Sequence, residues 1–171
     1  MKSGVDYRRL FGPLALVWIG LDLLTKRVAE GDLRPVPPIQ VVGDWVQLRL
    51  IYNQGAAFGL HLGEYSRWIF MLIAAVAIVA LTWKAFSDRD WNEGLRQAAS
   101  ALVVGGAAGN LIDRVRSAAG VIDFIDVGVG TLRWPTFNVA DIGVSCGAVA
   151  LAISFWLEDA RRAREAAQPS S

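Results

Sequence analysis

The feature that most constrains this chain is a set of long apolar runs from which charged side chains are absent. Residues 68–83, 97–112 and 142–157 contain no Asp, Glu, Lys or Arg. A helix needs about 20 mostly apolar residues to cross a lipid bilayer. With their flanking residues, the runs predict membrane-spanning helices over residues 68–86, 95–113 and 137–157. A further span is expected over residues 10–28, although Asp22, Lys26 and Arg27 lie in its second half.

The composition excludes most other classes of protein. Apolar residues make up 54% of the 171 residues and charged residues only 19%, with a mean hydropathy of +0.38. Such a chain is too apolar for a disordered protein or an ordinary soluble domain. The 17 basic residues are balanced by 16 acidic ones, so no nucleic-acid partner is expected. One cysteine, Cys146, and one histidine, His61, exclude a disulfide framework and a cysteine-rich zinc site.

The segments around the predicted spans complete a single membrane domain over residues 1–171. No small-residue cleavage site follows residues 10–28, so this helix is expected to stay as an anchor rather than be removed as a signal peptide. The run at residues 41–52 alternates apolar and polar side chains, which predicts a strand inside the long loop 32–65. Residues 115–136 form a second loop, and residues 158–171 form a tail that carries Arg161, Arg162 and Arg164 and ends in a small, frayed polar stub.

The orientation follows from basic residues close to the ends of the spans. Nine of the 17 Lys and Arg residues lie on the side of the two termini, so the total count barely separates the sides. The positive-inside rule gives most weight to charges near span ends, and the terminal clusters lie there. Both termini are therefore expected in the cytoplasm, with loops 32–65 and 115–136 outside.

The order of the spans brings several acidic residues to one membrane surface. With four crossings, Asp22, Asp113 and Asp141 lie at span ends that share a side, and Asp123 lies in the loop between the last two spans. A charged residue inside a span costs about 2.5–3.5 kcal/mol, which makes it a functional candidate. A position at the interface would cost little, so Asp22 and Asp113 alone leave both interpretations open.

The spacing Asn-x-x-Asp occurs twice, at residues 110–113 and 138–141. Residues three apart on a helix share a face, so each Asn amide can orient its neighbouring carboxylate or a substrate carbonyl. Two carboxylates close together share a proton, so one can activate water while the other polarises a carbonyl. Hydrolysis of this kind needs no metal, no other cofactor and no nucleophilic side chain.

The sequence GVSCG at residues 143–147 also matches the G-x-S-x-G pattern of serine hydrolases. It lies inside a predicted helix, and the only histidine, His61, is in a distant loop where a structural role is favoured. We therefore interpret the two glycines as a helix-packing face, and the glycines of residues 105–109 in the same way. Cys146 is expected to be a small buried residue.

Five motifs, taken in order, resemble those of bacterial lipoprotein signal peptidase, the signal peptidase II family. They are DLLTK at residues 22–26, NQGAAFG at 53–59, GGAAGNLIDR at 105–114, VIDF at 121–124 and FNVAD at 137–141. The resemblance covers the chain from the first span to the last. It departs at Leu23, where the family often has Gln, at Ile142, where Ser often follows the acidic residue, and in the length of segment 115–122.

The resemblance implies an aspartic endopeptidase of the bacterial inner membrane, with four transmembrane helices and an extracytoplasmic β-cradle. Such enzymes remove the signal peptide from prolipoproteins, cutting before a cysteine that carries diacylglyceryl, so the expected partners are these precursors and membrane lipids. The resemblance makes Asp123 and Asp141 the catalytic pair, whereas spacing alone cannot choose between Asp113 and Asp123. It gives supporting or substrate-positioning roles to Asp22, Lys26, Asn53, Asn110, Asp113, Arg114 and Asn138. A monomer without metal or cofactor is expected.

Two other classes of function remain open from the residues alone. A small proton- or ion-coupled transporter would also use intramembrane carboxylates, but these cluster on one side without partners leading across the membrane. A non-enzymatic assembly factor would use the glycine faces, but it would leave the Asn and Asp residues without a purpose.

Overall fold

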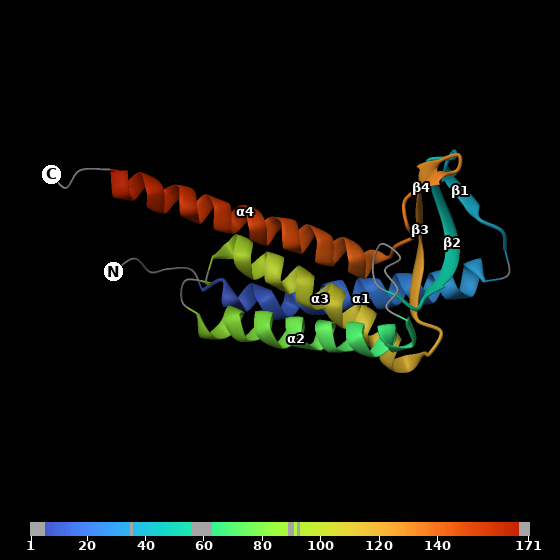
Figure 1. Ribbon diagram of the computed structural model, residues 1–171, viewed down its shortest axis with the longest axis horizontal. Helices are drawn as coiled ribbons and strands as arrows, with labels where there is room; N and C mark the ends of the chain where they lie inside the picture. The colour runs from blue at the N-terminus through green and yellow to red at the C-terminus, as the bar shows by residue number, and fades with distance from the viewer. Residues whose placement is uncertain (1–5, 35, 56–62, 89–90, 92, 168–171) are drawn as a thin grey trace.

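The structure, a computed structural model, describes residues 6–34, 36–55, 63–88, 91 and 93–167. Within these residues, four α-helices form an elongated bundle: α1 (Arg8–Leu33), α2 (Ser66–Ser87), α3 (Gly94–Arg116) and α4 (Val139–Ala167). A small antiparallel sheet lies across one end of the bundle (Figure 1). The first turn of α1 and the last turn of α4 lie at the opposite end, where α4 extends beyond the other helices. The predicted fold, mostly helical with a small sheet, is confirmed.

The helices coincide with the predicted spans but continue past several of their boundaries. The largest difference is in α4, which runs to Ala167, so most of the C-terminal tail is helical, while the predicted frayed stub at its end lies outside the described residues. The cause is local, because residues 158–167 consist mainly of Ala, Arg and Glu, which favour helix. Two helical segments, Gly63–Ser87 and Val139–Ala167, are long and apolar enough to cross a membrane. Neither α1 nor α3 passes this test. That these two helices cross the membrane therefore stays a prediction.

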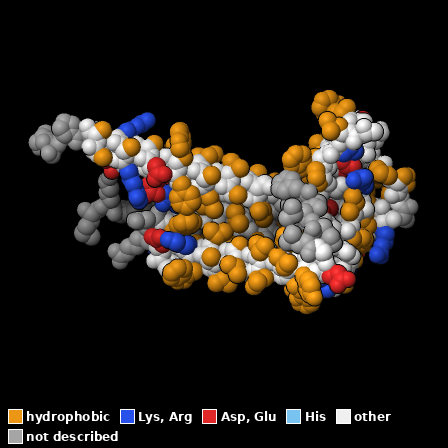
Figure 2. Space-filling model, viewed as in Figure 1, with side chains coloured by type: hydrophobic (Ala, Val, Ile, Leu, Met, Phe, Trp, Pro, Cys, Tyr) orange, Lys and Arg blue, Asp and Glu red, His pale blue; other side chains and the backbone are white. Residues whose placement is uncertain are grey.

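The bundle is apolar on its surface and polar in part of its interior. Leu16 and Val79 are 70% and 68% exposed, whereas Asp22 and Lys26 are 0% and 2% exposed. Figure 2 shows hydrophobic side chains covering the middle of the bundle, with charged side chains gathered toward its two ends. A soluble protein rarely exposes so large an apolar surface. This distribution suits a bundle surrounded by lipid.

Glycines allow the helices to approach closely. A Cβ atom at Gly109 would overlap the carboxylate of Asp22, and one at Gly147 would press on the backbone of α3 at Ala99. The predicted packing role of the glycine pairs in residues 105–109 and 143–147 is therefore confirmed. The G-x-S-x-G match lies within α4, without the strand-to-helix turn of a serine hydrolase.

Two smaller expectations have different outcomes. The prediction that Cys146 is buried is wrong, because its side chain is exposed. It lines an open, mostly apolar hollow together with Trp134 and Phe137, and the hollow leaves it uncovered. The predicted structural role of His61 concerns a position outside the described residues.

The sheet has the strand order β1 (Ile39–Val42), β2 (Val46–Asn53), β3 (Val121–Val129) and β4 (Leu132–Arg133), and each strand is antiparallel to its neighbour. The predicted single strand over residues 41–52 is divided by a turn, in which Gly43 adopts the left-handed φ of +49°. An apolar cluster that includes Ala29 of α1 and Phe124 of β3 holds the sheet against the bundle. Pairing of β2 with β3 places Ile51 opposite Asp123.

Candidate active site

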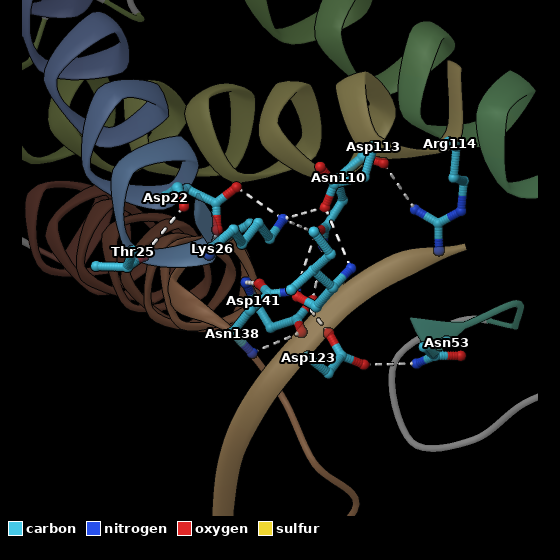
Figure 3. Close-up of polar contacts among 12 residues, drawn as sticks. Asp22, Thr25, Lys26, Asn53, Asn110, Asp113, Arg114, Asp123, Asn138 and Asp141 are labelled. Carbon is cyan, nitrogen blue, oxygen red and sulfur yellow. Dashed lines mark hydrogen bonds and ion pairs between the residues drawn. The ribbon is translucent and has the colours of Figure 1, made fainter. Parts of the chain in front are cut away.

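All nine predicted site residues lie in one cluster where the sheet meets the bundle (Figure 3). Each of the helices α1, α3 and α4 contributes to the cluster, as do the end of β2 and the start of β3. The carboxylates that the span order predicts to share a side are thus brought together. Residues 56–59, which complete the NQGAAFG motif, lie outside the described residues.

Lys26 is the centre of a buried group of charges. Its Nζ lies 2.7 Å from Asp22 Oδ2 and 2.8 Å from Asp113 Oδ2, and it donates a hydrogen bond of 2.8 Å to Asn110 Oδ1. An ammonium group has three N–H donors, so each of them has a partner here. Burial of a charge is tolerated when the charge is paired and hydrogen-bonded. Lys26 therefore ties α1 to α3 inside the cluster.

Two Asn side chains hold the proposed catalytic carboxylates. Asn110 Nδ2 donates to Asp141 Oδ1 at 2.8 Å, and Asn138 Nδ2 donates to Asp123 Oδ1 at 2.7 Å. Asn110 Oδ1 in turn accepts from Lys26 and from Asn138. An ammonium group can only donate, so the contact with Lys26 fixes which side of the Asn110 amide faces Asp141.

The Asn-x-x-Asp spacing works differently from the sequence prediction. Neither side-chain amide donates to the carboxylate three residues further on; each donates to a carboxylate of another segment. Asp113 pairs instead with Lys26 and accepts a 3.3 Å hydrogen bond from the backbone N–H of Ile122. The prediction fails because α3 and α4 converge, so a partner on the facing element is nearer than one on the same helix.

The start of α4 sets the position of Asp141. The backbone N–H of Asp141 donates to Asn138 Oδ1 at 2.9 Å, and the N–H of Asn138 donates to Asp141 Oδ2 at 3.2 Å. This reciprocal pair is a capping box. Two contacts from α1 reinforce it: Asp22 Oδ1 accepts from Ala140 N at 2.8 Å, and Trp18 Nε1 donates to Val139 O at 3.2 Å.

Asp123 lies on β3 and is 2% exposed. Asn53 Nδ2 donates to its Oδ2 at 2.9 Å. Gly120, just before β3, has a φ of +112°, and a Cβ there would overlap the carbonyl of Asn53. A glycine is therefore needed where the chain enters β3 beside the end of β2. Burial raises the pKa of Asp123 from 3.8 to about 7, the charge of Asp141 raises it as well, and the bond from Asn53 opposes the rise. A carboxyl group with this pKa can hold or release a proton near neutral pH.

Arg114 supports the segment that follows β2. It is 7% exposed, and its Nη2 donates to the carbonyl of Gly55 at 2.8 Å. Its Nη1 donates to Asn110 O at 3.3 Å, and its own carbonyl accepts from Arg67 Nε at 2.8 Å. In this arrangement the guanidinium group fixes the chain next to Asn53, which itself holds Asp123.

Each of the two carboxylates lines a hollow of its own. A hollow of about 400 Å³ is lined by Asp123 together with Asn53 and Thr136. A mostly apolar hollow of about 240 Å³ is lined by Asp141 together with Trp134 and Phe137. Among the described residues, no group of three or more His, Cys, Asp or Glu side chains is arranged to hold a metal ion.

One buried acidic residue, Asp126, was not identified from the sequence. It is 1% exposed, and its carboxylate forms ion pairs with Arg133 Nε at 2.7 Å and with Arg49 Nε at 3.0 Å. The sequence signal that could have identified Asp126 is its position within the apolar run of β3. A carboxylate buried there needs a cation from a neighbouring element. Without the strand pairing, the sequence cannot say which arginines provide it.

The fold is that of a bacterial membrane enzyme. A solved structure described as a bacterial membrane enzyme matches 92% of this chain and 91% of its own length, with a TM-score of 0.75 and 26% identity. A second structure with the same description matches 83% of this chain and 89% of its own length, with a TM-score of 0.69 and 27% identity.

The sequence places the chain more closely. Residues 14–157 match the family model described as Signal peptidase (SPase) II. The lipoprotein signal peptidase of Hydrogenovibrio crunogenus is 42% identical, with 85% of this chain and 84% of the relative covered. The lipoprotein signal peptidase of Rhodococcus jostii is 39% identical, with 85% and 72% covered. The chain therefore belongs to the signal peptidase II family, which confirms the resemblance; the transporter alternative has no support from these relatives.

Proposed function

We propose that this chain is an intramembrane aspartic endopeptidase that removes the signal peptide from diacylglyceryl-modified prolipoproteins and cuts just before the lipidated cysteine. Its membership of the signal peptidase II family and the names of its relatives support a peptidase that acts on lipoprotein precursors. The observation that carries the aspartic mechanism is the pair of amide donors, Asn110 and the buried Asn138, each bonded to one carboxylate of the Asp123–Asp141 pair.

The chemistry follows from a proton shared between the two carboxylates. The ionised member removes a proton from a water molecule, whose oxygen attacks the carbonyl carbon of the peptide bond. The protonated member donates a hydrogen bond to the carbonyl oxygen, where negative charge develops. When the tetrahedral intermediate collapses, the C–N bond breaks and the nitrogen takes up a proton. The products are the carboxyl end of the signal peptide and the free α-amino group of the lipidated cysteine.

The remaining predicted residues act as positioning residues in this scheme. Lys26 fixes the orientation of the Asn110 amide, and Asp22 holds the first turn of α4 through Ala140 N. Asn53 restrains Asp123, and Arg114 anchors the chain after Asn53. Reacting groups that are held before substrate arrives do not have to be ordered during the reaction, which lowers its barrier.

The setting we propose is the bacterial inner membrane, crossed by all four helices, with both termini in the cytoplasm and the sheet outside. Exposed apolar side chains on α1, including Leu16 and Leu24, support a lipid-facing surface on a helix that buries Asp22 and Lys26 on its inner face. The signal helix of the precursor would enter from the bilayer, and its acyl chains would stay in the lipid. We propose that the protein acts as a monomer and without a metal or other cofactor.

Cleavage of lipidated and unlipidated precursor by the purified protein tests this function. The lipidated precursor should be cut directly before the modified cysteine, as read by mass spectrometry of both products. The same precursor without diacylglyceryl, at equal concentration, should be cut much more slowly. Equal cleavage of both would show a general intramembrane peptidase and contradict the proposed substrate.

A further inference from the structure

The 400 Å³ hollow beside Asp123 is also lined by an arginine, Arg49, which the mechanism does not use. Arg49, Ile51 and Asn53 line it from β2, and Thr136 faces them from the segment before α4. Side chains two apart on a strand point to the same face and lie about 7 Å apart. The register of β2 against β3 shifts between Leu48 and Ile51, so this spacing holds from Ile51 to Asn53. Arg49 is placed beside them by the hollow itself, which it lines together with Asn53, the residue that bonds to Asp123.

The guanidinium group of Arg49 is held in place from one side. Its Nε forms the 3.0 Å ion pair with Asp126 and donates to Thr136 Oγ1 at 3.3 Å, and its Nη2 donates to the same oxygen at 3.1 Å. Asp126 is itself fixed by Arg133 at 2.7 Å. Arg133 also pairs with Asp44 at 3.4 Å, so two arginines and two carboxylates meet here. Arg49 is therefore available to a ligand because its side chain is exposed, not because positive charge is in excess.

The other side of the Arg49 guanidinium group faces the hollow. The side chain is 40% exposed, and its Nη1 makes no hydrogen bond within the described part of the chain. A guanidinium group has five N–H donors in a planar fork that matches a carboxylate. The guanidinium group of Arg49 is fixed and partly exposed, and it lines the same hollow as Asp123. It is therefore suited to bind an anionic group of a bound peptide.

We propose that this hollow binds the first residues of the mature lipoprotein, directly after the lipidated cysteine, and that Arg49 favours an acidic side chain among them. This inference rests on the proposed function. Most residues that line the hollow belong to β2 or follow it directly. The sheet that contains β2 lies across the end of the helical bundle (Figure 1), so the hollow suits the polar chain that leaves the membrane rather than the signal helix. An extended peptide advances about 3.3 Å per residue, the same rise as β2, so the second and third residues after the cut lie within reach of Arg49.

The test uses three lipidated precursors that differ only in the second and third residues counted from the cysteine: both Asp, both Asn or both Lys. Asp and Asn have nearly the same shape, so their comparison isolates the charge. The wild-type protein should cleave the Asp precursor with a kcat/KM about three- to tenfold above that of the Asn precursor, as expected for a charge-assisted hydrogen bond at a partly exposed site. The Lys precursor should be the slowest.

Substitution of Arg49 should remove this preference without removing activity. Arg49→Gln should cleave the Asp and Asn precursors at equal rates, while the Asn precursor is cut about as fast as by the wild type. Arg49→Lys, which keeps the charge but not the fork, should show an intermediate ratio and provides the same comparison should the Gln variant fail to fold. Arg116→Gln removes an exposed cation that does not line the hollow and should leave the ratio unchanged.

The outcomes separate this inference from the proposed function. A wild-type protein that cuts the three precursors equally, or an Arg49→Gln variant that keeps the full preference, overturns the role of Arg49 and leaves the peptidase in place. A wild-type protein that cuts none of the lipidated precursors overturns the proposed function itself.

Discussion

Three neutral side chains, Asn53, Asn110 and Asn138, make the direct contacts to the two carboxylates. An amide donor stabilises a carboxylate without cancelling its charge, so the pair can still share one proton. Among the described residues, Lys26 forms no hydrogen bond with either carboxylate and instead donates to Asn110, which holds Asp141. This separation of orienting groups from charged groups is what we expect of a site that must hold and release a proton.

The pH dependence of cleavage should show this proton. Because the pKa of Asp123 is raised to about 7, kcat/KM should fall on the alkaline side with an apparent pKa near that value, which belongs to the pair as a whole. Asn53→Ala removes a donor that favours ionised Asp123, so its pKa should rise further and the alkaline limb should move to higher pH. A limb that moves to lower pH in this variant would be incompatible with the described contact.

The same pKa makes a prediction about stability. An acid whose pKa is raised by folding binds its proton more tightly in the folded state, so its contribution to stability is present below the unfolded value of 3.8 and is lost as the pH rises to about 7. Asp123→Asn removes this titration, so the unfolding temperature of the wild type should fall relative to that of the variant as the pH rises from 3.8 to about 7. Thermal unfolding in detergent across this pH range, with Asp32→Asn as an exposed control, measures the difference; a difference that does not change with pH would argue against the raised pKa.

At the residue level, the sequence predicted the identities in the cluster better than their contacts. The order of the spans brought Asp22, Asp113 and Asp141 to one side without any knowledge of the packing. Which Asn donates to which carboxylate depends on how α3, α4 and β3 converge, and that is a property of tertiary structure. Asp126 was missed for the same reason, because its two arginines are provided by neighbouring strands.

At the level of the elements, the site depends on how closely α1 approaches α3. Gly109 lies against the carboxylate of Asp22, so the helices meet there without an intervening side chain. This contact lets Lys26 of α1 reach both Asp113 and Asn110 of α3. The glycine pattern indicated close packing in the sequence, but not the buried carboxylate on the other side.

Gly109→Ala should therefore impair both folding and catalysis. The added methyl group must displace Asp22, which moves α1 away from α3 and weakens the contacts of Lys26. We expect a lower unfolding temperature and a loss of cleavage of at least about tenfold, within the cost of overpacking a close contact. Gly20→Ala is the matched control, because a Cβ there meets no atom within 4 Å; equal effects of the two substitutions would rule out this explanation.

The sheet illustrates a limit of pattern analysis. The alternation over residues 41–52 correctly indicated extended chain, but the turn at Gly43 that divides it into β1 and β2 was not predicted. Asp44 and Trp45, which follow Gly43 in that turn, interrupt the alternation only briefly. The helices were easier to predict, because an apolar run of that length has few alternatives.

For the whole molecule, the main prediction concerns the position of the sheet relative to the membrane. The sheet and the first and last described helical turns lie at opposite ends of the bundle (Figure 1). An apolar middle with charged ends, as Figure 2 shows, suits a bundle that crosses the bilayer along its long axis. In the orientation we propose, with both termini in the cytoplasm, the cluster lies at the outer surface, where a scissile bond next to a lipid anchor would be found.

Labelling of single cysteines in intact cells tests this arrangement. Cys146 is exposed on α4, so it is first replaced by Ala. A cysteine at Leu132, which is 83% exposed in the sheet, should react with a membrane-impermeant maleimide added from outside. A cysteine at Arg164, near the end of α4, should react only after the membrane is permeabilised. The reverse pattern would show that the sheet faces the cytoplasm.

The most direct test of the central claim is cleavage of a lipidated precursor by Asp123→Asn and Asp141→Asn, each purified beside the wild type and the Asp32→Asn control. Loss of a general acid or base typically costs about 10²–10⁴-fold in rate. We predict a loss of at least this size for both active-site variants, with unchanged binding of the uncut precursor and a cooperative unfolding transition that shows a folded protein, while the control cleaves normally. Cleavage at the wild-type rate by either Asp123→Asn or Asp141→Asn would contradict the account.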